Sequence, residues 1–107
     1  MYFKVARELT VVNGVDAFTP AMAMGDNNST QIDATVVVNT ATSLGLVTQG
    51  SNDTQGWTDI TTNSGLVVGF AAPTKTTGIA FRYVRLKAVV AGTGTVIFSA
   101  GVNTAKL

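Results

Sequence analysis

Tight-turn signals recur roughly every 8–12 residues along this chain, a spacing typical of antiparallel β proteins. The clearest turns are Asn13-Gly14, Asn63-Ser64-Gly65 and Gly92-Thr93-Gly94. The stretches between them are rich in Val and Thr, whose branched side chains favour the pleated surface of a strand. Short strands at regular spacing with little or no helix predict an all-β fold, an antiparallel β-sandwich or jelly roll of about eight strands.

The strand pattern is clearest over residues 32–40, where Ile32, Ala34, Val36 and Val38 share one face and polar side chains dominate the other. Residues 79–91 form the longest expected strand, and residues 21–30 read as a loop. The other expected strands are residues 2–12, 15–19, 44–49, 57–62, 66–70 and 95–102. A chain of 107 residues fits a single β-sandwich domain over residues 1–107.

Charge is sparse and unevenly distributed. Charged residues make up 12% of the chain, against about 25% in an average domain, and the net charge is +1. We therefore expect neither a nucleic acid nor a membrane as partner. All acidic residues lie at or before Asp59, whereas five of the seven basic residues follow it. Pairing of opposite charges across neighbouring strands of one monomer is the favoured interpretation, and complementary faces on two copies are the alternative.

The inventory of reactive side chains is small. The chain has no Cys and no His, which excludes thiol chemistry, disulfides and imidazole-based catalysis or metal binding. The loop Asp26-Asn27-Asn28 offers too few oxygen ligands for calcium. We expect no enzymatic activity, no metal and no cofactor. Charges within Met1–Glu8 argue against a signal peptide, and no apolar run approaches the ~18 residues of a membrane span.

Two motifs occur in order, Gly50-Ser51-Asn52-Asp53 followed by Trp57, and then Phe81–Leu86, which reads FRYVRL. Over roughly residues 31–103 they resemble the discoidin, or coagulation-factor C-domain, jelly roll. That family places a G-S-N-D-G turn before a tryptophan strand and an A-R-Y-V-R-L strand later. The chain is shorter than the family, lacks its upstream tryptophan-containing segment and has Thr54-Gln55-Gly56 after the turn. The resemblance implies a jelly roll and, as an alternative function, a carbohydrate- or cell-surface-binding module.

The same residues allow a reading from physical chemistry alone. We expect Trp57 to fill the space between the sheets, with Val84 and Leu86 beside it in the core. An exposed Trp57 that stacks on a sugar or base is the alternative. Arg82 shares the parity of Val84 and Leu86, so it needs a carboxylate partner or a place near an edge.

Asp53 or Asp59 is the candidate partner of Arg82. Asp53 is also expected to cap its own turn through side-chain hydrogen bonds. We therefore count Arg82 and Asp53, with Trp57, Val84 and Leu86, as structural residues.

The opposite parity of the long strand carries Tyr83, Arg85 and Lys87. Aromatic and basic residues interleaved on one strand suit either nucleic acid or a protein contact. Because the net charge is only +1, we expect a partner contact of the kind that joins the copies of an oligomer. The N-terminal segment, with Phe3 and Lys4, is expected to lie instead on the surface to which those copies bind.

A small β domain without a chemical site suits a structural or binding role in many copies. In overall character the chain resembles the capsid decoration (cement) proteins of tailed bacteriophages. The resemblance implies a trimer or other homo-oligomer bound to the major capsid protein or another virion protein. It also implies synthesis in the host cytoplasm and a final location on the capsid surface. The alternative is the carbohydrate-binding module, which would use Trp57 and Tyr83.

Overall fold

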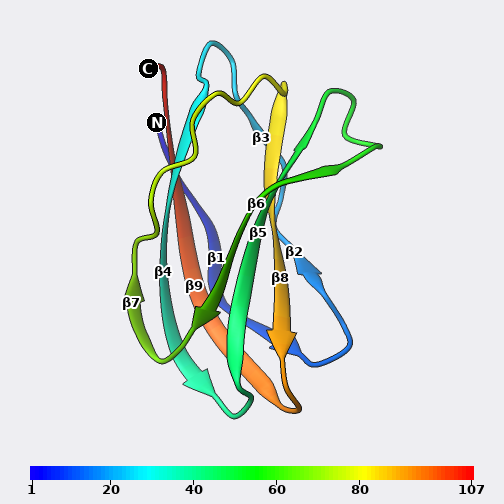
Figure 1. Ribbon diagram of the computed structural model, residues 1–107, viewed down its shortest axis with the longest axis vertical. Coiled ribbons are helices and arrows are strands. Elements are labelled where there is room, and N and C mark those ends of the chain that lie inside the picture. Colours follow the sequence, from blue (N-terminus) through cyan, green and yellow to red (C-terminus); the bar gives the residue numbers. More distant parts are fainter.

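The computed structural model describes residues 1–107 and consists of β-strands joined by turns and loops (Figure 1). No helix in it is long and apolar enough to cross a membrane. The nine strands are β1 (Tyr2–Val12), β2 (Ala17–Phe18), β3 (Met22–Ala23), β4 (Ser29–Asn39), β5 (Ser43–Ser51), β6 (Thr58–Leu66), β7 (Gly69–Ala71), β8 (Tyr83–Ala91) and β9 (Thr95–Ala105).

The strands form two antiparallel sheets that pack face to face. A four-stranded sheet has the order β1-β9-β4-β7, and a five-stranded sheet has the order β2-β8-β5-β6, with β3 also paired to β8. Pro20 lies between β2 and β3, and because proline cannot donate to a ladder it divides one edge strand into two pieces. With β2 and β3 counted together, the first strand pairs with the last, the second with the seventh, the third with the sixth and the fourth with the fifth. This nested pairing is a jelly roll, and it confirms the predicted fold class.

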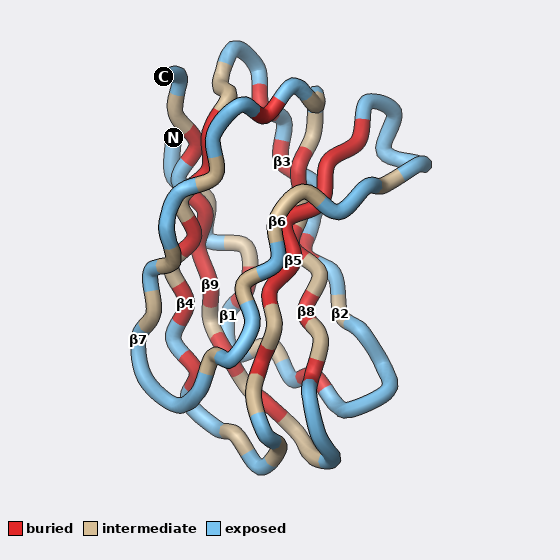
Figure 2. The backbone as a smooth tube through the Cα atoms, viewed as in Figure 1, coloured by how far each residue is buried: buried red, intermediate tan, exposed pale blue.

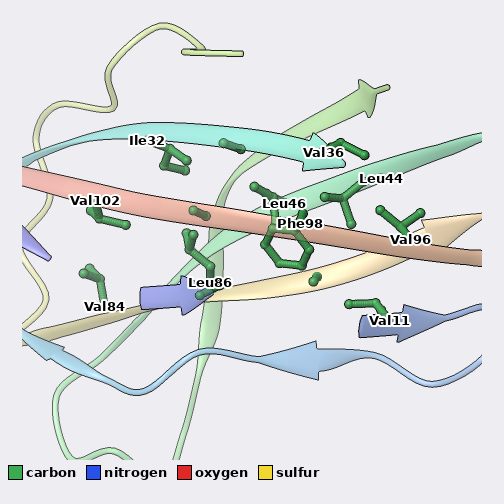
Figure 3. Packing of buried hydrophobic residues seen from close by; sticks show 14 of the residues in the cluster. Val11, Ile32, Val36, Leu44, Leu46, Val84, Leu86, Val96, Phe98 and Val102 are labelled. Carbon is green, nitrogen blue, oxygen red and sulfur yellow. The ribbon is translucent and has the colours of Figure 1, made fainter. Parts of the chain in front are cut away.

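Alternating side chains from both sheets build the core (Figure 3). In β8, Val84 and Leu86 point inward, and in β9 Phe98 is fully buried at the centre of the cluster. Burial of a Phe side chain removes the largest apolar area of any residue in this core, so Phe98 contributes most per residue to the hydrophobic stabilisation.

Three of the residues expected in the structural core lie outside it. Trp57 is half-buried and precedes the first residue of β6, where its indole N–H donates to the Thr54 carbonyl at 3.2 Å. This bond holds the ring over the turn on the outer side of the sheet, so the expectation of an indole between the sheets is wrong. Arg82 and Asp53 are both exposed, because Arg82 precedes β8 and Asp53 lies in the turn between β5 and β6.

The expected loop at residues 21–30 is also partly wrong. Met22 and Met24 are buried in the core cluster, and Met22 belongs to β3. The segment reads Ala-Met-Ala-Met, an alternation of small and large apolar side chains with the period of two of a strand. Conversely, the long strand expected from residue 79 begins only at Tyr83.

We expect Phe98→Ala to lower the free energy of unfolding by about 3–5 kcal/mol, because Phe98 is fully buried and its truncation leaves a cavity. Phe98→Leu, which keeps most of the apolar volume, loses less. Denaturant unfolding measures both. Val15→Ala, at a residue 64% exposed, is the control and changes the same quantity by less than about 0.5 kcal/mol. Equal losses for Phe98→Ala and Val15→Ala would contradict this core.

Candidate functional site

The outer face of the five-stranded sheet is organised around β8. Tyr83, Arg85 and Lys87 alternate with the core residues of that strand and point away from the core, each of them half-buried. Their neighbours are β2 and β3 on one side and β5 on the other. Three of the five residues expected to contact a partner therefore share one face.

The guanidinium of Arg85 lies between two aromatic rings that come from opposite sides of β8. Its Cζ is 4.2 Å from the ring centroid of Phe18, in β2, and 4.2 Å from that of Trp57, next to β6. A cation at this distance over an aromatic face is attracted by the ring quadrupole, at about 0.5–1 kcal/mol per pair at exposed sites. Two such contacts restrict the rotamers of Arg85.

A polar chain across three strands fixes the same side chain. The Nε of Arg85 donates to Oε1 of Gln49 at 2.9 Å, and Nε2 of Gln49 donates to Oδ1 of Asp59 at 2.8 Å. Gln49 is the cross-strand partner of both residues, which explains why this chain forms. The terminal Nη groups of Arg85 donate no hydrogen bond within the protein. We call Phe18, Gln49, Trp57, Tyr83, Arg85 and Lys87 together the Arg85 face.

Beside this cluster lies the single ion pair of the structure, in which Lys87 Nζ is 3.7 Å from Asp16 Oδ2. It joins an early acidic residue to a late basic one within one monomer, as the favoured interpretation of the charge distribution predicts. Arg82, in contrast, forms no ion pair with Asp53 or Asp59, because it is exposed and needs no compensating charge. Surface ion pairs of this kind contribute at most about 1 kcal/mol to stability. The pair with Asp16 therefore does not prevent Lys87 from being a candidate partner contact.

The turn after β5 is held by its own side chains. Oδ1 of Asp53 accepts hydrogen bonds from the backbone N–H groups of Gln55 at 2.9 Å and Gly56 at 3.0 Å, and from the Ser51 hydroxyl at 3.1 Å. These donors favour the ionised carboxylate and hold the pKa of Asp53 below its ordinary value of 3.8. Asp53 thus caps its turn as the sequence predicts.

The same turn is tied to the beginning of β8, because Oδ1 of Asn52 accepts a hydrogen bond from the backbone N–H of Arg82 at 3.1 Å. The two sequence motifs therefore meet in space. Their hydrogen bonds are internal to the protein, and they position Trp57 beside Arg85. No group of three or more acidic, His or Cys side chains is arranged to hold a metal ion.

Phe3 and Lys4 lie apart from the Arg85 face. They belong to β1, at the edge of the four-stranded sheet, where Phe3 packs partly against the core and Lys4 is exposed. Together with Met22 and Ala23 they line a shallow groove between β1 and β3. The structure therefore does not bring all expected partner contacts onto one surface.

Sequence reasoning missed Phe18 and Gln49. Phe18 falls within an expected short strand, but only the pairing of β2 with β8 shows that its ring reaches Arg85. Gln49 was expected in a strand without a role. The roles of Phe18 and Gln49 follow from how β2 and β5 align with β8. A single sequence does not specify that alignment.

Comparison with known proteins finds a structural likeness and no likeness in sequence. No protein-family model matches the chain, and no curated protein matches it. The crystal structure of SPBc2 prophage-derived protein YomS superposes with a TM-score of 0.61 at 11% sequence identity, over 98% of this chain and 92% of that one. A phage-derived protein shares this fold. At that identity the likeness concerns the fold alone, and the resemblance to discoidin domains gains no support.

The packing of Arg85 on Trp57 is testable by fluorescence, because Trp57 is the only tryptophan. We expect Arg85→Ala to shift its emission to longer wavelength, to increase quenching by acrylamide and to lower the free energy of unfolding by about 1–2 kcal/mol. Arg82→Ala removes an equally charged side chain that makes no cation–π contact with Trp57, and it should leave the emission unchanged. Identical spectra for wild type and Arg85→Ala would refute this geometry.

The Asp53 turn predicts a pH dependence. Because its folded-state pKa is lowered, the ionised carboxylate stabilises the fold above about pH 4, and this contribution is lost as the pH falls through the folded-state pKa. Asp53→Ala should therefore be less stable than wild type at pH 7, and the difference should shrink in acid. Unfolding titrations at several pH values measure it. Asp26→Ala, whose carboxylate accepts no hydrogen bond, serves as control, and a pH-independent difference for Asp53→Ala would count against the mechanism.

Proposed function

We propose that this protein is a non-enzymatic structural protein of a bacteriophage virion, a decoration or cement protein that binds the capsid surface in many copies. The observation that carries the proposal is the Arg85 face, where a guanidinium is held between two aromatic rings with its terminal nitrogens available to a partner. The shared fold with a prophage-derived protein supports a phage setting.

The composition and rigidity of the Arg85 face suit protein recognition. Trp, Tyr and Arg are the residues that most often dominate binding energy at interfaces. Arg85 is already ordered by Phe18, Trp57 and Gln49, so less side-chain entropy is lost when a partner binds. A planar guanidinium with free Nη groups pairs bidentately with a carboxylate.

These properties indicate the partner that we propose. An acidic side chain on the major capsid protein, or on another virion protein, would receive the Nη groups of Arg85, while Tyr83 and Lys87 contact its surroundings. Identical sites repeat over a symmetric shell, so modest affinity at each site is sufficient when many copies act together. We propose that the protein binds neither nucleic acid nor a membrane. We also propose that it is made in the host cytoplasm and is located on the capsid surface of the virion.

A carbohydrate-binding function has less support. A sugar would stack on an open aromatic face, but the guanidinium of Arg85 already lies over the ring of Trp57. A glycan array on which binding depends on Trp57 would favour this alternative.

The proposal is tested on particles of the phage that encodes the chain, prepared with and without its gene. Purified wild-type protein should co-sediment with the gene-deleted particles, and Arg85→Glu should weaken that binding by at least about tenfold through loss of a central contact and charge repulsion. Arg82→Glu makes the same charge change at an exposed residue outside the Arg85 face and should bind like wild type.

Mass spectrometry of purified wild-type virions provides the second measurement, and the protein should be present among the head proteins. Its absence from virions, together with no binding of wild-type protein to the deleted particles, would overturn the proposal. Unchanged binding of Arg85→Glu would overturn the role of the Arg85 face.

A further inference from the structure

A second surface on this molecule is apolar and uncharged. Five of the eleven large apolar side chains that are exposed lie in two short segments, the end of β4 and the stretch from the β6–β7 connection into β7, which are neighbours at the edge of the four-stranded sheet. They are Val37 (48% exposed), Val38 (40%), Val67 (57%), Val68 (61%) and Phe70 (70%), and we call them the β7 patch. Contiguous exposed apolar groups of this kind mark interaction sites in soluble proteins.

Strand register brings the members of the β7 patch together. Thr35 pairs with Phe70 and Val36 with Gly69, so Val37 and Val68 are the residues that directly follow the end of this ladder on the two segments. A register shift between Val36 and Val38 turns Val37 and Val38 both outward. β7 pairs only with β4, so its other edge is free (Figure 2, where the exposed segment at β7 is pale blue).

The charge distribution distinguishes this edge from the other edges of the sandwich. No charged residue occurs between Asp59 and Lys75, a range that includes all of β7 and its connection to β6. The β1 edge carries Lys4, Arg7 and Glu8, and the β2 edge begins next to Asp16. The exposed side chains of the β6 edge are polar, and one of them, Asp59, is charged.

We propose that a second copy of this chain packs on the β7 patch, with the two copies related by a two-fold axis. In a two-fold contact the same surface faces itself, so any charge within it would lie near its own image. The β7 patch contains no charged residue, so two copies can face each other there without like-charge repulsion. Two free β7 edges also present each other with unpaired backbone groups for antiparallel pairing.

A dimer contact centred on the β7 patch would also include the surface around it. A standard interface buries about 800 Å² per partner, roughly one-seventh of the 5473 Å² exposed by one copy. The β7 patch supplies an apolar centre, and the neighbouring Thr and Ala residues supply a rim. It lies on the four-stranded sheet, whereas the Arg85 face lies on the five-stranded sheet, so a dimer leaves both Arg85 faces open. The inference does not depend on a virion location.

Sedimentation velocity of the purified full chain, from micromolar to submillimolar concentration, tests the proposal. We expect wild type to show a concentration-dependent monomer–dimer equilibrium. Val68→Asp should raise the dissociation constant at least about 30-fold, because it places two carboxylates near each other across the axis. Phe70→Ser, which adds no charge, should weaken the dimer as well.

Val15→Asp is the matched control, since Val15 is 64% exposed and lies outside the β7 patch. It should dimerise like wild type. A wild-type protein that is monomeric at every concentration would overturn the proposal, as would equal effects of Val68→Asp and Val15→Asp. A monomeric wild type that loses particle binding on Val68→Asp would assign the β7 patch to the capsid and would also exclude the dimer.

Discussion

The register of β8 in its sheet determines which of its side chains lie in the core and which lie on the outer face. The side chains of Val84 and Leu86 close the core, and the alternate side chains of Arg85 and Lys87 form the outer face. A shift of one residue would exchange these sets, because side chains alternate between the two faces of a strand. The hydrophobic core therefore holds Arg85 opposite Gln49, and the Arg85 face depends on burial that occurs on the other side of the same strand.

Regular alternation and turn signals were sufficient to predict the architecture. The eight expected strands correspond to the jelly roll once β2 and β3 are counted as one, and the burial of Val84 and Leu86 follows from their parity. The position of Trp57 could not be predicted in this way. A large aromatic residue next to a strand suits either a core or an outer face, and the choice depends on a hydrogen bond to Thr54 and on the approach of Arg85 from a distant strand.

The candidate site was predictable only in part. Alternation along β8 predicts that Tyr83, Arg85 and Lys87 share one face. Phe18 and Gln49 reach Arg85 through strand pairings separated by tens of residues, which a single sequence does not reveal. The two surfaces differ in kind: the Arg85 face carries charged side chains ordered by aromatic rings and hydrogen bonds, and the β7 patch is apolar and uncharged. The two proposals therefore assign an unlike partner to one sheet and a second copy of the chain to the other.

The place of β9 has a consequence for biosynthesis. This last strand of the fold lies between β1 and β4, and it forms the longest ladders of the four-stranded sheet. During translation β1 and β4 leave the ribosome with no partner between them, and the sheet closes only after β9 has been made. Such non-local pairing slows folding, and it leaves apolar strand edges open while the chain is incomplete. A chain that ends before β9 would therefore leave the facing edges of β1 and β4 unpaired.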